Sequence, residues 1–290
     1  MILVDINQVM ISNLMINLAM DPNGNQVEES MLRHMVLNSL RGYRNKFHEE
    51  FGELVICCDD RHYWRKETFP NYKASRKKSR DNSPLDWNNI FTTLNKIRDE
   101  LRDYMPYKVI RVETAEADDV IASLCNEYGT YLNTGTSQQI LILSGDKDFI
   151  QLLKYANVRQ YAPIQKKMLT TDNAERFLRE HILLGDASDG IPNFLSDDDT
   201  FVCDDKRQKS VSRVKLADWV DKSPTEFCTE ETLRNYRRNE ALIDLSKIPK
   251  EIQIKCVELY NNTDTAPRRG ILDYFIQKRL RNLIESIGEF

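Results

Sequence analysis

The chain has 290 residues, of which 41% are hydrophobic and 30% charged, a balance typical of a soluble globular protein of about two domains. Its 45 acidic side chains outnumber 41 basic ones, so the formal net charge is −4 and a uniformly basic surface is excluded. No stretch approaches the roughly 20 apolar residues of a membrane span, and no basic residue precedes the apolar N-terminal stretch as in a signal peptide, so we expect a cytosolic protein.

The first half of the chain alternates short apolar runs with amphipathic stretches. The apolar runs predict four buried strands, at residues 2–5, 54–59, 107–112 and 140–144. Apolar side chains recur at helical spacing between them, in residues 30–47, 85–104 and 115–128. Strands that alternate with helices predict an α/β fold, with a mostly parallel central sheet and helices on both faces.

The last hundred residues have a different pattern, because the strand signals disappear from about residue 191. Short helices are predicted there, at residues 210–221, 229–242, 249–261 and 270–287. We therefore predict an α/β domain at residues 1–190 and a smaller all-helical domain at residues 191–290.

Acidic side chains end the predicted strands or lie at the ends of helices. They are Asp5, Asp59, Glu116, Asp118, Asp119, Asp146, Asp148, Asp186 and Asp189. Ligands of an open parallel sheet bind beyond the carboxyl ends of its strands, so these groups are expected to converge on one edge. Like charges ~4 Å apart repel by about 4 kcal/mol even at an effective dielectric of about 20, so such a cluster needs cations.

The ligand types indicate which cations. Carboxylate oxygens select Mg²⁺, for which Mn²⁺ can substitute, and two such ions about 4 Å apart can hold both reacting oxygens of a phosphodiester. The four histidines are not spaced as a metal pair and the six cysteines form no C-x-x-C, so a zinc site is not expected. Each acidic residue alone could equally be a turn residue or a helix start.

Other phosphate chemistries lack their motifs. Neither G-x-x-x-x-G-K-[ST] nor G-x-G-x-x-G occurs, so a nucleotide-cradling loop is not expected. A phosphoaspartate phosphatase would carry a second aspartate two positions after Asp5, where this chain has Asn7.

A basic and aromatic segment follows the second predicted strand. Residues 61–80 contain eight basic side chains against one acidic one, interleaved with Tyr63, Trp64, Phe69 and Tyr72. Cations that bind phosphates beside rings that stack on bases are typical of nucleic-acid-binding segments, although a charge run alone is more often a solvated face. Its position next to a predicted acidic metal site favours nucleic-acid binding.

Four motifs stand in a fixed order along the chain: FPNYKASR at 69–76, EADD at 116–119, SGDKDF at 144–149 and GDASDGIP at 185–192. In order and spacing they resemble the motifs of the structure-specific 5′ nucleases, which include flap endonucleases and the 5′ nuclease domain of bacterial DNA polymerase I. The likeness is strongest to the bacteriophage ribonuclease H branch of that family and extends to the C-terminal residue.

The resemblance implies a role for each motif residue. The first metal ion would be held by Asp5, Asp59, Glu116 and Asp118, with Asp119 in the same shell. The second would be held by Asp146, Asp148 and Asp189, with Asp186 acting through water. Lys73 and Arg76 resemble the basic pair at the scissile phosphate, and Tyr72 resembles a residue that stacks on bases at the 5′ end. Further nucleic-acid contacts are predicted at Arg65, Lys66, Lys77, Lys78, Lys206, Arg207 and Lys209.

The implied activity is that of a Mg²⁺-dependent 5′ to 3′ exonuclease and flap endonuclease on RNA–DNA and DNA duplexes. In phage DNA replication, such an enzyme would remove RNA primers and adjacent DNA from lagging-strand fragments in the host bacterial cytoplasm. Flapped, nicked or RNA-primed duplexes would be its partners, and we expect a monomer without membrane contact. Binding to a single-stranded DNA-binding protein is implied by the resemblance alone.

The chain departs from the family at two places. Residues 193–205 contain no glycine and five acids, where cellular enzymes have a glycine-rich hairpin that grips duplex DNA. The polar stretch between residues 73 and 85 is expected to be a flexible bridge rather than a helical arch. Two alternatives stay open: a catalytically silent protein that binds branched DNA, and a toxin-like ribonuclease with a related α/β fold.

Overall fold

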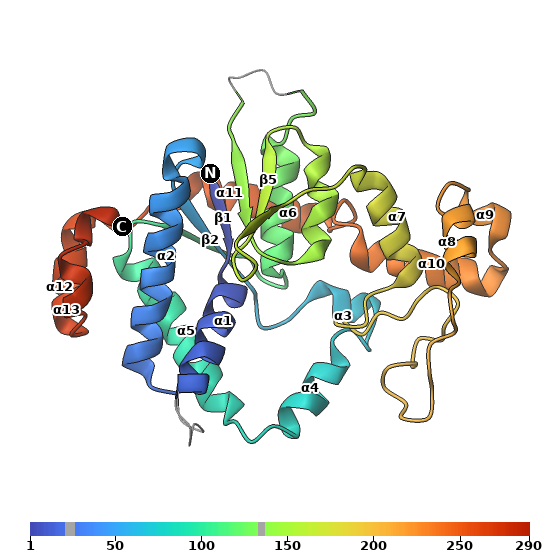
Figure 1. Cartoon of the computed structure of the whole chain (residues 1–290), viewed down its shortest axis with the longest axis horizontal. Helices are drawn as coiled ribbons and strands as arrows, with labels where there is room; N and C mark the ends of the chain where they lie inside the picture. Colours follow the sequence, from blue (N-terminus) through green and yellow to red (C-terminus); the bar gives the residue numbers. More distant parts are fainter. Residues whose placement is uncertain (21–26, 133–136) are drawn as a thin grey trace.

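A six-stranded sheet lies at the centre of the computed structural model, which describes residues 1–20, 27–132 and 137–290 (Figure 1). In chain order the strands are β1 (Ile2–Asp5), β2 (Leu54–Cys58), β3 (Lys108–Arg111), β4 (Ile140–Leu143), β5 (Val158–Ala162) and β6 (Lys167–Leu169). Their spatial order is β3-β2-β1-β4-β5-β6, parallel except for β6, which runs antiparallel to β5. The four predicted strands are confirmed. The sequence did not predict β5 and β6, because polar side chains interrupt their apolar residues.

Helices cover both faces of the sheet, as predicted. Alternate residues of a strand face opposite sides, so Ile2 and Val4 pack into one core and Leu3 packs into another. Around the first core lie α1 (Ile6–Met20), α2 (Glu29–Phe51) and α5 (Trp87–Tyr104). Around the second lie α6 (Ala117–Tyr128), the 3₁₀ helix η1 (Lys147–Lys154) and α11 (Lys250–Asn262).

The C-terminal half of the chain builds a third core and then returns to the sheet. The third core joins Phe69 and Tyr72 to α7 (Ala174–Leu184), α8 (Arg213–Trp219), α9 (Pro224–Phe227) and α10 (Glu230–Ile243). Beyond α11, the 3₁₀ helix η2 (Arg268–Gly270) leads to α12 (Ile271–Gln277) and α13 (Arg281–Ile284), which pack into the first core. The division into domains at residue 190 remains a prediction.

The single helix predicted at residues 270–287 is wrong, because the chain turns between α12 and α13. Arg279 adopts a left-handed conformation with φ 58°, and the Leu280 amide donates to the Phe275 carbonyl at 2.8 Å. The turn brings Leu280 and the C-terminal Phe290 into the first core, where the Phe275 and Phe290 rings lie 5.2 Å apart. A last 3₁₀ helix, η3 (Ile287–Glu289), ends the chain.

The basic segment forms two short helices, α3 (Trp64–Thr68) and α4 (Ala74–Asp81). The expectation of a flexible bridge after Lys73 is therefore wrong for α4, which spans the space between α3 and α5 in Figure 1. The sequence ASRKKSRD contains neither glycine nor proline, and its lysines and arginines are good helix formers. None of the α4 side chains is buried, so the helix presents its charges to solvent.

Within the described part of the chain, none of the helices is both long and apolar enough to cross a bilayer.

Candidate active site

The sheet order places a switch point between β1 and β4, where successive connections leave in opposite directions. Asp5 ends β1, and the Ser144 hydroxyl, which follows β4, donates to Asp5 Oδ2 at 3.1 Å. The Gln8 amide donates to Asp5 Oδ1 at 3.1 Å, and Gln8 Oε1 accepts from the Gly145 amide at 2.6 Å. These contacts fix the Asp5 carboxylate in the crevice where open α/β sheets bind their ligands.

Four carboxyl groups, those of Asp5, Asp59, Asp118 and Asp146, lie in one electrostatic cluster. Burial, followed by the charge of Asp59, raises the pKa of Asp5 to about 7, and burial with the charge of Asp148 raises the pKa of Asp146 to about 6. Burial and then the charge of Asp146 raise the pKa of Asp118 well above its usual value. No hydrogen bond or ion pair joins the Asp118 carboxylate to another residue that the structure describes. The basic side chains of the protein therefore do not neutralise the charge of these four carboxylates.

Glu116 differs from these groups because basic and phenolic side chains surround it. Lys73 Nζ lies 2.5 Å from Oε1, while Arg65 Nη1 and the Tyr72 hydroxyl both donate to Oε2 at 2.9 Å. The same hydroxyl lies 2.9 Å from Asp189 Oδ2. Although burial works in the opposite direction, the charges of Lys73 and Arg65 lower the pKa of Glu116. Glu116 is thus held ionised at the border between the acidic cluster and the basic segment.

A second contact between the basic segment and the cluster involves Asp189. Lys73 has a left-handed backbone with φ 55°, which points its amide at the Asp189 carbonyl, 2.7 Å away. Arg76 Nη2 reaches Asp189 Oδ1 at 2.5 Å, and Lys73 Nζ lies 3.4 Å from Oδ2. Gly190 permits this approach: its φ is 74°, and a Cβ there would lie 3.1 Å from the Asn71 carbonyl oxygen. The predicted pair Lys73 and Arg76 therefore lies at the edge of the carboxylates.

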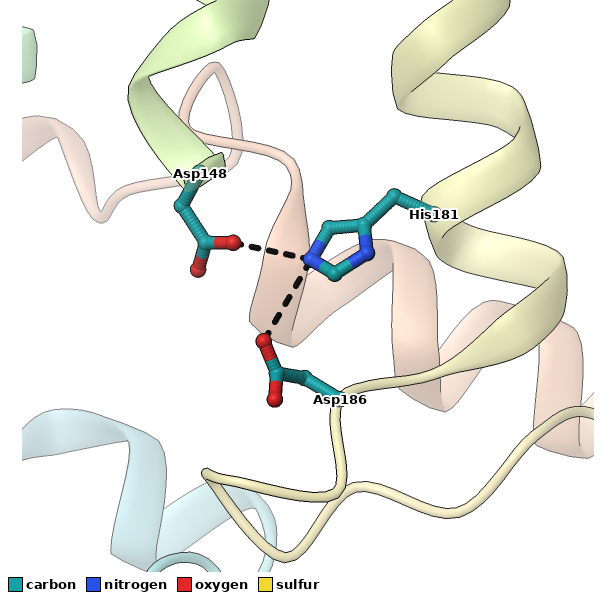
Figure 2. A group of neighbouring side chains, drawn as sticks. All are labelled: Asp148, His181 and Asp186. Carbon is teal, nitrogen blue, oxygen red and sulfur yellow. Dashed lines mark hydrogen bonds and ion pairs between the residues drawn. The ribbon is translucent and has the colours of Figure 1, made fainter. Parts of the chain in front are cut away.

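A third group combines two predicted acids with a histidine. Figure 2 shows Asp148, His181 and Asp186 pointing toward one another from η1, α7 and the turn after α7. His181 Nε2 lies 2.8 Å from Asp148 Oδ1 and 3.5 Å from Asp186 Oδ2. The sequence pattern did not identify His181, because 33 residues separate it from Asp148. The signal in the sequence that could have identified His181 is its position shortly before the GDASDG motif.

Asp119 differs from Asp118 in having several partners within the protein. Its side chain closes the capping box of α6 by accepting from the Glu116 amide at 2.8 Å, and it accepts from Trp64 Nε1 at 3.1 Å. Arg65 Nη1 lies 2.8 Å from Asp119 Oδ1. Oδ2 therefore accepts all the hydrogen bonds that the described residues donate to this carboxylate, including one from Arg65 Nη1 at 3.1 Å, whereas the buried Oδ1 is paired with Arg65 by charge alone.

Comparison with known proteins agrees with this site. A family model described as the 5′-3′ exonuclease N-terminal resolvase-like domain matches residues 2–181, and one described as T4 RNase H, C terminal matches residues 162–290. The ribonuclease H of Enterobacteria phage T4 is 33% identical over 298 residues, which cover 99% of this chain and 95% of that protein. This chain belongs to the 5′-3′ exonuclease family.

More distant members of the family also match. A 5′-3′ exonuclease of Buchnera aphidicola subsp. Schizaphis graminum is 26% identical, and the match covers 59% of this chain and 57% of that protein. The fold is that of the bacteriophage T5 D15 protein crystallised with metal ions, which matches at a TM-score of 0.64 and 12% identity over 90% of this chain and 98% of the other. The chain is accordingly a nuclease of the hydrolase class, and the resemblance seen in its motifs is confirmed.

The nuclease does not expose all the residues predicted to contact nucleic acid. Arg65 is 3% exposed, and besides its acidic partners it donates from Nε to the Leu242 carbonyl at 2.9 Å. Tyr72 is 2% exposed. The Tyr72 ring belongs to the third core, and the Arg65 guanidinium lies against α10, so neither is on the surface in this structure. The remaining predicted contacts are exposed: Lys66, Lys77, Lys78, Lys206, Arg207 and Lys209.

The acidic loop at residues 193–205 is bound by cations of the same chain. Arg234 Nη2 lies 3.2 Å from Asp198 Oδ1, which also pairs with Arg238. Lys206 Nζ lies 2.7 Å from Asp199. Lys78 of α4 reaches Asp204 at 2.5 Å, between two strongly exposed side chains. Two of the predicted DNA-binding lysines thus have carboxylate partners in this structure, of the weak kind that solvent screens.

The raised pKa values predict how the stability of the metal-free nuclease depends on pH. Between the ordinary aspartate value of 3.8 and about 7, folded Asp5 and Asp146 hold protons that the unfolded chain has lost. Their contribution to the free energy of unfolding therefore falls as pH rises through this window, and the loss is complete above about pH 7. Glu116 and Asp186, whose pKa values are lowered, are ionised in both states above about pH 5.

Urea unfolding in a chelator at pH 5, 6 and 8 measures this effect. We expect the free energy of unfolding of Asp5→Asn to fall less steeply with rising pH than that of the wild type, and to be higher than the wild-type value at pH 8. Added Mg²⁺ should stabilise the wild type most at pH 8. Identical pH profiles for the wild type and Asp5→Asn would contradict the assignment.

Proposed function

We propose that this chain is a divalent-cation-dependent 5′ nuclease that cuts a phosphodiester near the 5′ end of a flap, nick or RNA-primed duplex. The observation that carries the proposal is the convergence of carboxylates at the switch point of the sheet, with Lys73 and Arg76 at their edge. An acidic site for cations next to basic side chains for phosphate is the arrangement that such a cut requires.

The donor set fits two divalent cations of the Mg²⁺ type. Asp5, Asp59 and Asp118 would hold one, with Glu116 beside them, because Lys73 offsets their mutual repulsion only in part. Asp146, Asp148 and Asp189 would hold the other, with Asp186 nearby. Asp119 would orient α6 and Glu116 rather than contact a cation, because its Oδ2 accepts from Trp64, Arg65 and the Glu116 amide, and Arg65 already supplies a positive charge to it. Such ions supply activation of water and neutralisation of phosphate charge.

The basic side chains position and stabilise the phosphate. Lys73 is bound between Glu116 and Asp189, so its ammonium is held at a fixed point at the border of the cluster. Arg76 is half-exposed, with Nη2 on Asp189 Oδ1 and Nε donating to the Ser188 carbonyl at 3.5 Å, which leaves the rest of its guanidinium for a phosphate oxygen. Both charges would offset the negative charge that develops as the phosphodiester is cut.

The kind of substrate is inferred from the relatives. The bacteriophage T5 D15 flap endonuclease has been crystallised with DNA and metal ions, and its fold matches this chain at a TM-score of 0.58 and 12% identity. The T4 relative is named a ribonuclease H, which supports RNA primers as a substrate. We propose that the enzyme acts as a monomer in the host bacterial cytoplasm during phage replication, together with a single-stranded DNA-binding protein.

A 5′-labelled flap substrate tests the function. Incubation with Mg²⁺ should release the flap as a short labelled product that ends in a 3′-hydroxyl, whereas a chelator should prevent release. Parallel substrates with DNA and RNA flaps compare the two nucleic acids, and an RNA–RNA duplex tests the toxin-like ribonuclease. Binding of the flap without cleavage at any divalent-cation concentration would instead support the catalytically silent alternative.

Replacement of Arg76 should have a moderate effect. Arg76→Ala removes one charge at the edge of the site but leaves the cation ligands in place, so we expect cleavage to slow by about 10- to 100-fold at saturating Mg²⁺. Single-turnover cleavage measures this rate. Arg80→Ala on the same exposed helix is the matched control, and an equal loss in both variants would indicate general DNA attraction rather than a role at the phosphate.

A further inference from the structure

His181 is placed to do more than fill space beside the proposed second cation. The side chain is 6% exposed, and its Nε2 faces one carboxylate oxygen each of Asp148 and Asp186 (Figure 2). The three donor atoms lie within 4.8 Å of one another. Ligand atoms that share a cation at about 2.0 to 2.2 Å are separated by about 3 to 4 Å, and the distances of 2.8 and 3.5 Å from Nε2 to the two carboxylate oxygens lie close to this range.

The surrounding residues hold each donor in its orientation. Ser188 donates to Asp186 Oδ1 from its amide at 2.8 Å and from its hydroxyl at 2.6 Å, which leaves Oδ2 to face His181. The Phe177 ring stacks on the imidazole with centroids 5.9 Å apart. Lys147 lies 3.3 Å from Asp186 Oδ2, but its side chain is half-exposed and can leave. The imidazole and both carboxylates are thus oriented without a cation.

We propose that His181 is a nitrogen ligand of the second cation, together with Asp148 and Asp186, and that it gives this position a preference for Mn²⁺ over Mg²⁺. Mg²⁺ binds almost entirely through oxygen, whereas imidazole favours transition metals, and affinity for nitrogen rises from Mn²⁺ onward in the series. The inference rests on the proposed function for the existence of a second cation. It adds a ligand and a metal preference that the acidic motifs do not contain.

The alternative role for His181 is that of a positioning residue, which donates an N–H to Asp148 and never contacts the cation. The two roles differ in which atom Nε2 faces when a cation is bound. A spectroscopic measurement of nitrogen coordination separates them, and activity alone does not.

Electron spin echo envelope modulation of Mn²⁺ bound to the full-length protein at pH 8, without DNA, is the decisive experiment. We expect ¹⁴N modulation from a coordinated imidazole, and its replacement by a ¹⁵N pattern when histidine is labelled. The modulation should disappear in His181→Asn and persist in His48→Asn, whose imidazole is exposed beside Glu53. The labelling arm uses the wild-type protein and so does not depend on the folding of a variant.

Titration of the same proteins with each metal gives a second readout. His181→Asn should weaken the tighter Mn²⁺ binding by about tenfold and change Mg²⁺ binding by less than about threefold. Bound Mn²⁺ without nitrogen modulation, or modulation that survives in His181→Asn, would overturn the inference. If the flap substrate is still cut, either outcome rejects His181 as a ligand but not the nuclease function. Failure of the inference can therefore be distinguished from failure of the proposed function.

Discussion

Asp118→Asn should slow cleavage of a 5′ flap by about a thousandfold or more in saturating Mg²⁺, equivalent to about 4 kcal/mol of transition-state stabilisation. The Asp118 carboxylate is partly buried, and its pKa is raised by burial and by Asp146. Asparagine has nearly the same shape but no charge, so the fold is retained while the affinity for a divalent cation falls. Single-turnover cleavage over a range of Mg²⁺ concentrations measures the loss.

Two further measurements make this result specific. Asp118→Asn should still bind the flap, as measured by fluorescence anisotropy, because the basic segment is unchanged. Its metal-free form should unfold at a higher urea concentration at pH 8 than the wild type does, since one repelling charge has gone. Asp172→Asn, at an exposed aspartate, should behave as wild type throughout. Full cleavage by Asp118→Asn would reject the proposed cation site.

Arg65→Met should lower the free energy of unfolding by about 3 to 5 kcal/mol. Arg65 is the buried cation between Glu116 and Asp119, and all three side chains are almost fully enclosed. Methionine fills much of the same volume but removes the cation that Asp119 pairs with and one of the two that Glu116 pairs with, and the Leu242 carbonyl loses its donor. Urea or thermal unfolding of the variant measures the change.

The control for this prediction is Arg61→Met, an exposed arginine of the same segment, which should change stability by less than about 0.5 kcal/mol. Combining Arg65→Met with Asp119→Asn should cost less than the sum of the single changes, because one of the uncompensated charges is then absent. A loss of DNA affinity with unchanged stability would restore the nucleic-acid contact predicted from sequence.

The predictable parts of the fold were those with strong local patterns. The apolar runs of β1, β2 and β4 are buried from end to end, and such runs identify strands whatever surrounds them. In β3, Ile110 is buried while Arg111 is exposed, so its strand pattern is weaker. β5 mixes Arg159 and Gln160 with apolar residues, so its position in the sheet depends on pairing with β4. The break between α12 and α13 likewise serves tertiary packing, since it turns Leu280 toward the first core.

The residues of the site likewise divide into those that the local sequence could place and those that depend on tertiary packing. Acidic side chains after strands could be placed at one edge because parallel strands end together, and the structure brings Asp5 and Asp146 to neighbouring strands there. Charge and aromaticity in the basic segment did not distinguish solvent-facing side chains from buried ones. Tyr72 lies inside because α7 and α10 pack against it, and Arg65 because it binds the Leu242 carbonyl of α10, which residues 61–80 alone could not indicate.

The sequence by itself determined the α/β class, the acidic edge and the 5′ nuclease family, because each depends on local periodicity or on motifs in fixed order. Only the tertiary structure decided which charges face one another. It separated Asp118, whose carboxylate has no hydrogen bond or ion pair among the described residues, from Asp119, bound by Arg65, although the two are adjacent in the chain. It also brought His181 to Asp148, since the packing of α7 against η1 sets that distance and the spacing along the chain does not.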